Sequence, residues 1–444
     1  MTSVPRDVGE TLRVLVDRAQ RDRDLPSLAA ATFSAGQVVW QARVGEPADQ
    51  YRIGSITKTF TAVEVMRLRD EGRLNLDDPL GTHVPDAPYG DQSVRRLLSH
   101  SSGMTAEPAG PWWERTSGGP WPELVAANAA RRITAFAPGT RYHYSNLGYA
   151  LLGEAVARLR GRTWFEAVHQ SLLAPLGLDS TTYGPQPGAA VGTSRDPRSG
   201  QLVGEPSHDS AAMAPAGQLW SNVTDLARWT DVLAVGAEGI LAPATAIEMR
   251  TAQAADPDTQ HLQAYGLGLR LEWTTGGTLV GHTGSMPGFL AAVLVDPGSR
   301  VGAAVMTNAT VGLQPASLAR QLLETTAEAL PAAVPAPDAS ESMPTGVMEL
   351  LGDWYWGNTV MTVRAMPDGF VIDDGGSTPR FAAAGSDRYL GSSGYFAGEE
   401  LLVVRRQDGS VSHLEVVTFV LTRIPYDDRV PVSGGPPTRL SSPG

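Results

Sequence analysis

The sequence predicts a large α/β (α+β) domain followed by a small all-β domain. Three observations support this prediction. Helical and strand patterns are interspersed over residues 1–330 of the 444-residue chain. Residues 331–344 are then rich in Pro, Ala and Ser, which is typical of a linker. Short strand patterns with glycine turns occupy residues 345–427, and a Pro/Gly/Ser-rich tail, expected to be flexible, occupies residues 428–444.

The elements of the first domain follow from apolar spacing and from Gly and Pro punctuation. An amphipathic helix is expected within residues 1–20, and the two long loops are expected where Gly, Pro and Ser accumulate, at 105–122 and 184–218. The remaining predictions are strands at 27–33, 37–44, 267–273, 278–281, 290–295 and 302–307, and helices at 55–71, 147–160 and 315–329.

The last domain shows the pattern of an antiparallel meander or a small barrel. Its turns are marked by glycines that follow aspartates, because glycine readily adopts positive φ. The predicted strands include 360–364, 400–405, 412–418 and 419–423.

Composition excludes several function classes. A formal net charge of −12 argues against a nucleic-acid binder and against a polybasic membrane contact. With no cysteine, the chain has no disulfide, thiolate nucleophile or iron–sulfur cluster. Its eight histidines show no H-x-H or H-E-x-x-H spacing, so neither a metal nor a cofactor is predicted. No apolar leader or membrane-length stretch is visible, and the expected location is the cytoplasm.

One lysine stands out. Of the 35 basic residues only Lys58 is a lysine, and it lies three positions after Ser55 at the start of a predicted helix. Positions i and i+3 share a helix face, so the two side chains can hydrogen-bond. A serine becomes a good nucleophile when a base removes its proton, and a lysine with a lowered pKa can be that base. Arginine cannot, because guanidinium does not titrate near neutral pH.

A plainer interpretation is also available for this pair. Ser55 can be a helix N-cap with an exposed lysine nearby, and a GC-rich coding bias can leave a single lysine by chance. Two further motifs favour chemistry. Tyr144 and Asn146 precede the predicted helix 147–160, and His282-Thr283-Gly284-Ser285 follows the predicted strand 278–281.

Together these residues resemble the penicillin-binding-protein and serine β-lactamase superfamily, nearest to its class C-like and esterase-like branches. The family's S-x-x-K motif falls on Ser55 and Lys58, its Y-x-N motif on Tyr144 and Asn146, and its K/H-T-G motif on 282–284. Two other stretches have the same character, 97–104 (LLSHSSGM) and 219–229 (LWSNVTDLARW).

The resemblance covers about residues 10 to 330 and implies a β-lactamase-like fold. That fold has an antiparallel sheet flanked by helices, plus a helical subdomain. The C-terminal piece resembles the small lipocalin-like barrel found in penicillin-binding-protein-type thioesterases. His100, in the first of the two extra stretches, is predicted to be a structural turn residue.

The family mechanism implies a role for each matching residue. Ser55 is expected to be acylated, while Lys58 and Tyr144 share its proton, without a decision on which is the base. Asn146 is expected to orient Lys58 and the substrate amide. The backbone N–H groups of Ser55 and Ser285 are expected to form the oxyanion hole, and such donors contribute about 3–4 kcal/mol each.

The third motif departs from the β-lactamase pattern. Many members have lysine where this chain has His282, and a mostly neutral histidine favours esterases, D-amino-acid peptidases and thioesterases over β-lactamases. Thr283 and Gly284 are expected to line the substrate site. Trp112 and Trp113, in a Pro/Gly-rich loop, can wall the acyl pocket or simply pack the loop down.

Four functions are consistent with these motifs. The first is a stand-alone thioesterase that releases and macrocyclises a nonribosomal peptidyl thioester, either free or bound to a carrier protein. The second is a D-stereospecific peptidase, a DD-carboxypeptidase-like enzyme or a broad esterase. A β-lactamase and a non-catalytic binding module are disfavoured, the former by His282 and the latter by the presence of every catalytic residue type. The motifs do not distinguish water from an amine as the acyl acceptor.

Overall fold

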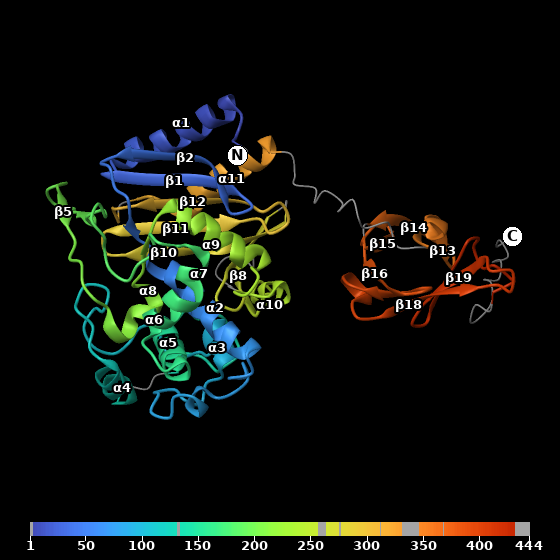
Figure 1. The fold of residues 1–444 in the computed structure, drawn as a ribbon, viewed down its shortest axis with the longest axis horizontal. Helices are drawn as coiled ribbons and strands as arrows, with labels where there is room; N and C mark the ends of the chain where they lie inside the picture. The colour runs from blue at the N-terminus through green and yellow to red at the C-terminus, as the bar shows by residue number, and fades with distance from the viewer. Residues whose placement is uncertain are drawn as a thin grey trace, which may run out of the picture. The chain divides into compact units, whose positions relative to one another are not determined.

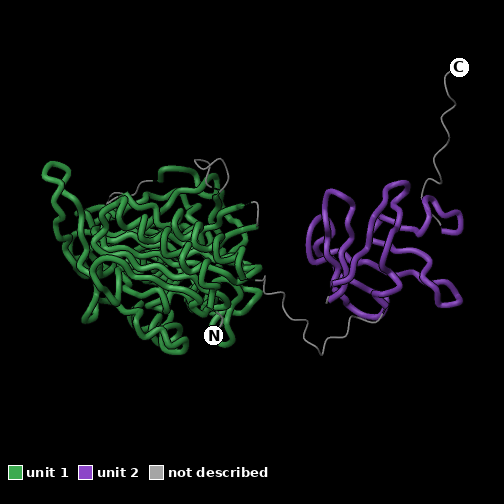
Figure 2. The backbone as a smooth tube through the Cα atoms, turned by 90° about the horizontal axis from the view of Figure 1, so that it is seen from above, with its two compact units in different colours: residues 1–333 green, residues 334–444 purple. Residues whose placement is uncertain are grey.

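The computed structural model describes the chain in two compact units (Figures 1 and 2), and its division falls between Ala333 and Val334. The predicted linker, 331–344, lies outside the described residues, and so does the tail beyond residue 430. The described residues are 3–130, 134–255, 263–274, 277–310, 312–330, 346–366 and 368–430.

An eight-stranded antiparallel sheet forms the centre of the first unit, in the order β2-β1-β12-β11-β10-β9-β8-β7. Strands from the beginning and from the end of the first unit meet in it, because β1 pairs with β12. The strands are β1 (Ser27–Ser34), β2 (Gln37–Gly45), β7 (Ala254–Ala255), β8 (Gln263–Tyr265), β9 (Arg270–Thr274), β10 (Gly277–Met286), β11 (Phe289–Val295) and β12 (Val301–Thr307).

Helices cover both faces of this sheet (Figure 1). Helices α1 (Arg6–Arg23) and α11 (Pro315–Ala329) cover one face with apolar stripes such as Leu12 and Val16 on α1. The other face is covered by α9 (Val223–Val235), while α2 (Thr57–Asp70) lies in the apolar core on that side and α5 (Asn146–Arg160) packs on α2. A strand between two such layers buries both of its faces, which explains why nearly every residue of β1 is buried.

Shorter elements complete the first unit. The two-stranded pairs are β3 (Tyr51–Arg52) with β6 (Trp220–Ser221), and β4 (Thr193–Arg195) with β5 (Leu202–Gly204). The short helices are α3 (Val94–Leu98), α4 (Trp121–Ala130), α6 (Trp164–Val168), α7 (Ala174–Leu176), α8 (Ala214–Gly217) and α10 (Pro243–Met249). Helical turns lie at Gly54–Ile56, Leu80–Thr82, His169–Leu173 and Ala211–Met213.

The second unit is a closed barrel of eight strands, β13 to β20. Its interior is filled by apolar side chains, with Trp354, Phe370 and Phe381 fully buried. Its elements are α12 (Val347–Leu350), β13 (Gly352–Trp356), β14 (Thr359–Met366), β15 (Gly369–Asp373), β16 (Arg380–Gly385), β17 (Arg388–Gly391), a helical turn (Gly394–Phe396), β18 (Glu400–Arg405), β19 (Val411–Val416) and β20 (Phe419–Thr422). The predicted small all-β barrel is confirmed.

The predicted fold class is confirmed. Helix α9 and strands β7 and β8 had no predicted counterpart, and two further segments differ in detail. Strand β10 extends to Met286, so the His282 motif lies within the strand rather than after it. The stretch predicted as a loop at 184–218 contains the β4–β5 hairpin and the short helix α8. Each strand of the hairpin has only three residues, and α8 is Ala-Pro-Ala-Gly, so neither element is long or periodic enough to be predicted from the sequence.

Candidate active site

Ser55 and Lys58 lie at the start of helix α2. A helical turn, Gly54–Ile56, leads directly into this helix, so the predicted helix start is correct. The Lys58 Nζ atom lies 3.0 Å from the Ser55 Oγ atom. The i, i+3 spacing thus places the two groups in hydrogen-bond contact, as the sequence predicts.

Lys58 is fully buried and surrounded by neutral acceptors. Besides the Ser55 hydroxyl, its ammonium donates to the Asn146 Oδ1 atom at 2.7 Å and to the Ala216 carbonyl at 2.7 Å. Burial without a directly bonded carboxylate lowers the pKa of Lys58 to about 7, although Glu107 and Glu114 partly oppose this shift. A substantial share of Lys58 is therefore neutral at neutral pH.

Tyr144 and Asn146 reach the same point from the start of α5. Ser145 caps this helix by accepting from the Gly148 N–H, which fixes the residues on either side of it. Burial holds the pKa of Tyr144 well above the usual value, and its interaction with the Ser55 side chain opposes this shift only in part. The Lys58 Nζ atom lies 4.9 Å from the centre of the Tyr144 ring.

Two glycines allow strand β10 to lie directly against the helical turn Gly54–Ile56, here called the nucleophile turn because it carries Ser55. A Cβ atom on Gly284 would lie 1.9 Å from the Ile53 carbonyl oxygen, and a Cβ atom on Gly54 would lie 2.7 Å from the Ser285 nitrogen. Gly54 also has a φ of +52°, which favours glycine. This close approach places the backbone of Ser285 beside Ser55, the arrangement that an oxyanion hole requires.

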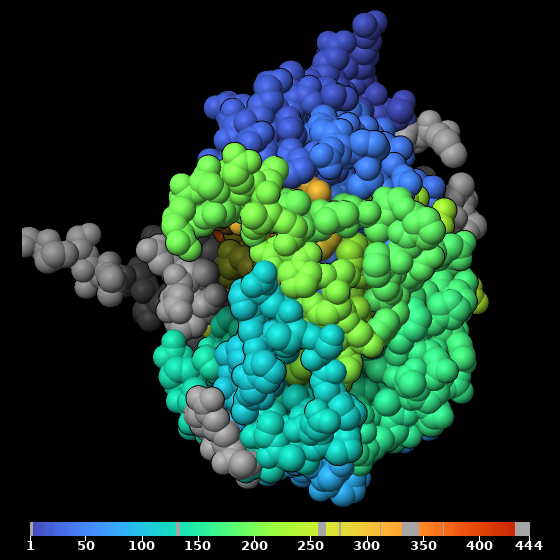
Figure 3. Space-filling view, turned by 90° about the vertical axis from the view of Figure 1, so that its left-hand side faces the viewer, coloured from blue at the N-terminus to red at the C-terminus, as the bar shows by residue number. Residues whose placement is uncertain are grey.

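A cavity of about 560 Å³ opens at this point. Figure 3 shows a hollow in this face of the first unit, with yellow and orange atoms from late in the sequence of this unit recessed between light-green and cyan segments. The cavity is lined by residues from distant parts of the chain, among them Ser55, Tyr144, Tyr265, His282, Thr283 and Ser285. Its size lies within the roughly 300–1,000 Å³ range of sites that bury small organic ligands.

His282 is a neutral imidazole in this cavity. Its Nδ1 atom contacts the Thr283 carbonyl, which can only accept, so Nδ1 carries the hydrogen. Its Nε2 atom then accepts from the Tyr265 hydroxyl at 2.7 Å. Burial, Lys58 and Arg270 together lower the pKa of His282 to about 3, with burial the largest cause. His282 therefore offers no positive charge to a substrate.

The two tryptophans differ in exposure. Trp113 is buried against Gly217, and its Nε1–H donates to the Glu107 carboxylate at 2.8 Å. Trp112 is 59% exposed and donates to Glu114. Neither lines the cavity that holds Ser55; Trp113 lines a separate pocket of about 320 Å³. The alternative that part of this loop packs down therefore holds for Trp113.

Several groups that contact the site residues were not predicted from the sequence. The Ala216 carbonyl is a backbone group, and the Tyr265 hydroxyl lies in a strand without a recognisable motif. His100 has a φ of +54° as expected of a turn residue, but it also accepts from the Ser145 N–H and packs 4.2 Å from the Tyr144 ring centre. Glu107 binds Asn146, a contact that no spacing predicts.

Within the described ranges, no group of three or more His, Asp or Glu side chains is arranged to hold a metal ion. Over the same ranges, no helix is both long and apolar enough to span a bilayer.

Known families match both units. A model of the beta-lactamase family matches residues 12–328, which is most of the chain. A second model, described as a domain of unknown function (DUF7586), matches residues 343–423.

Individual relatives point in the same direction. Penicillin-binding protein 4 of Amycolatopsis lactamdurans is 30% identical over 331 residues, covering 68% of this chain and 81% of the relative. A D-stereospecific amidohydrolase from Streptomyces sp. has a similar structure, with a TM-score of 0.62 and 26% identity over 72% of this chain and 98% of its own. The penicillin-binding protein homologue from Pyrococcus abyssi, described as octameric, has a TM-score of 0.62 and covers 93% of this chain and 99% of its own. At 24% identity, the last comparison shows only a shared fold.

Proposed function

Because the chain belongs to the beta-lactamase family of serine hydrolases, we propose that it transfers acyl groups from D-configured amides, esters or thioesters through an acyl-Ser55 intermediate. The observation that carries this proposal is the contact of 3.0 Å between Ser55 Oγ and the buried Lys58 Nζ. A lysine with a pKa of about 7 is poised to accept the serine proton at neutral pH.

Each proton has a place in this mechanism. Neutral Lys58 takes the proton of Ser55 as Oγ bonds to the substrate carbonyl carbon. The backbone N–H groups of Ser55 and Ser285 stabilise the oxyanion, about 3–4 kcal/mol each. The bond to the leaving amine, alkoxide or thiolate then breaks, and the proton passes to the leaving group through Lys58 or Tyr144. Water or an amine finally attacks the acyl carbon and gives its proton to this pair. The bond between the acyl carbon and Ser55 Oγ then breaks, and the pair returns the proton to Oγ.

The neutral third motif supports substrates that do not rely on a cation at position 282. His282 cannot form an ion pair with a carboxylate, because its pKa is about 3. This favours amides, esters and thioesters over β-lactams. The D configuration is supported by the similarity to the Streptomyces enzyme, whose name describes a D-stereospecific amidohydrolase.

A second candidate uses the same residues with an amine as acceptor. It is the release and macrocyclisation of a nonribosomal peptidyl thioester, presented free or on a carrier protein. The cavity of about 560 Å³ favours it, because this volume exceeds what a single amino-acid amide needs. Both candidates predict an acyl-Ser55 intermediate, and they differ only in the product.

The test is intact-mass detection of acyl-Ser55 over a substrate panel, with product analysis. The panel contains D- and L-amino-acid amides and esters, matched peptidyl thioester mimics with D- and L-configured acyl-donor residues, and nitrocefin. We expect acylation by the D isomers; linear acid identifies a hydrolase, and cyclic product identifies the second candidate. Equal acylation by L isomers, or rapid nitrocefin hydrolysis, would contradict the substrate assignment. No modification of Ser55 by a fluorophosphonate would contradict the catalytic role itself.

A further inference from the structure

Glu107 lies one hydrogen bond beyond the residues described so far. Its Oε1 atom accepts from the Asn146 Nδ2–H at 2.7 Å, and its Oε2 atom accepts from the Trp113 Nε1–H at 2.8 Å. Asn146 and Trp113 are both buried, whereas Glu107 itself is exposed. Each carboxylate oxygen therefore holds one buried donor.

The orientation of the Asn146 amide follows from its two neighbours. Lys58 offers only donors, so the amide oxygen must face it, and the Glu107 carboxylate offers only acceptors, so the amide nitrogen must face that side. The reversed amide would set its N–H group against the Lys58 ammonium and its oxygen against the Glu107 carboxylate. Both flanking contacts thus select the same orientation, which gives Lys58 its acceptor at 2.7 Å.

We propose that Glu107 is a positioning residue, which locks the Asn146 amide and through it holds Lys58 in line with Ser55. This inference rests on the proposed function, because it assigns Glu107 to the control of the proposed base. A glutamine at this position can satisfy only one of the two donors as an acceptor, since its second head atom is itself a donor. The carboxylate, and not merely its shape, is therefore required.

Glu107 also contributes negative charge near Lys58. Its charge, like that of Glu114, raises the pKa of Lys58 against the effect of burial. Other titratable groups also lie around Lys58. Its charge helps to lower the pKa of His100 and of His282. Its Nζ atom also lies over two tyrosine rings. These groups are Tyr144 and Tyr149 at α5, His282 on β10 and His100 in the loop after α3, which also holds Glu107 and Glu114.

The test compares Glu107→Gln with Glu114→Gln in the full-length protein, using a fluorophosphonate that carries no amino or amide group. Glu114 is a matched control, because its charge also acts on Lys58 but its side chain bonds Trp112 rather than Asn146. We expect Glu107→Gln to lower the plateau rate of Ser55 labelling about tenfold, the loss typical of a charge-assisted hydrogen bond. The acid limb of the pH–rate profile should also move to lower pH. The negative charge of Glu107 raises the pKa of Lys58, and the variant removes that charge. Glu114→Gln should keep the plateau within about twofold.

A double-mutant cycle separates positioning from other roles. In an Asn146→Ala background, Glu107→Gln should lower labelling by less than twofold, because the amide that it acts through is gone. An equal tenfold loss in both backgrounds would overturn the proposal. An unchanged plateau rate of Ser55 labelling in Glu107→Gln, with the wild type labelled normally, would also overturn it. A loss seen only with amine-bearing substrates would instead place Glu107 in direct contact with substrate and overturn the positioning role. A wild-type protein that is not labelled at all would refute the proposed function, and this inference with it.

Discussion

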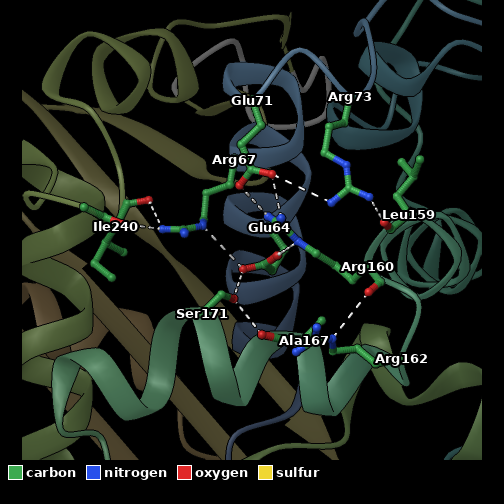
Figure 4. A network of polar contacts seen from close by, with 11 residues as sticks. Glu64, Arg67, Glu71, Arg73, Leu159, Arg160, Arg162, Ala167, Ser171 and Ile240 are labelled. Carbon is green, nitrogen blue, oxygen red and sulfur yellow. Dashed lines mark hydrogen bonds and ion pairs between the residues drawn. The ribbon is translucent and has the colours of Figure 1, made fainter.

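Helix α2 buries two ionisable side chains of opposite charge, one with charged partners and the other with neutral partners only. Lys58 and Glu64 both have no exposed surface, and they lie within two helical turns of each other. Glu64 meets Arg160 Nε at 3.0 Å and Arg67 Nε at 3.6 Å, and the Ser171 hydroxyl also donates to it (Figure 4). Lys58 bonds only neutral oxygens.

This difference shows how one helix provides both stability and reactivity. The Glu64 network ties α2 to α5 through compensated charge, because Arg160 lies on α5 and also binds Glu71. The Lys58 site lacks a directly bonded counter-charge, so burial acts on the lysine and lowers its pKa to about 7. A salt-bridged lysine would hold its proton too firmly to act as a base.

The strongest way to break the comparison is to keep the charge at position 58 and remove its ability to titrate. Lys58→Arg should lower Ser55 acylation about 10³–10⁴-fold, because guanidinium cannot release a proton near neutral pH. Stopped-flow labelling with a fluorophosphonate measures the rate, and circular dichroism checks that the fold is retained.

The matched control is the reverse exchange on the same helix, Arg67→Lys. Position 67 supplies charge and donors to Glu64 and to the Gly239 and Ile240 carbonyls. A lysine there should therefore leave acylation within about twofold. An active Lys58→Arg enzyme would refute the acid–base role of the lysine.

The second prediction breaks the compensated side. Arg160→Ala leaves Glu64 with the longer Arg67 contact and the Ser171 hydroxyl, and removing one charged partner of a buried pair costs about 3–5 kcal/mol. Urea unfolding should report a loss in this range, while labelling of Ser55 in the folded protein stays within about twofold. Arg158→Ala is the matched control on α5, and since its partners Asp86 and Glu154 are more exposed, it should cost below about 1 kcal/mol. Equal losses for the two variants would show that burial of Glu64 does not set the energy.

The sequence allowed the prediction of those parts of the site that lie close together along the chain. Ser55 and Lys58 are one helical turn apart, and helix geometry brings them together. Tyr144 and Asn146 lie on either side of the extended N-cap residue Ser145, at the start of α5. Six of the eight strands of the sheet and the helices α1, α2, α5 and α11 were predictable from apolar periodicity, which reports the buried face of an element. The short strands β7 and β8 and the helix α9 were not predicted.

Contacts between distant segments could not be predicted in this way. The third acceptor of Lys58 is the backbone carbonyl of Ala216, in a short helix whose Ala-Pro-Ala-Gly sequence is typical of a loop. Buried side chains of α2 hold that helix in place, with Lys58 and Thr61 donating to successive carbonyls. Glu107 likewise sits 39 residues from Asn146 in a Pro- and Gly-rich loop, where a single sequence carries no signal of pairing.

The last prediction sharpens the comparison through stability rather than rate. The pKa of Lys58 is about 7 in the folded chain and about 10.4 when unfolded, so between these values the unfolded chain binds more protons. The penalty of burying the charged lysine is therefore fully present below pH 7 and is relieved as the pH rises. The free energy of unfolding of the wild type, measured relative to Lys58→Met, should increase by about 2–3 kcal/mol between pH 6 and pH 9.

The corresponding difference for Arg67→Met should stay flat, because an arginine does not titrate in this range. Taking differences between matched variants cancels the contribution of the C-terminal barrel to the unfolding curves. A flat difference for Lys58→Met would show that the lysine keeps its proton in the folded protein, which would leave Tyr144 as the group that must accept the proton of Ser55.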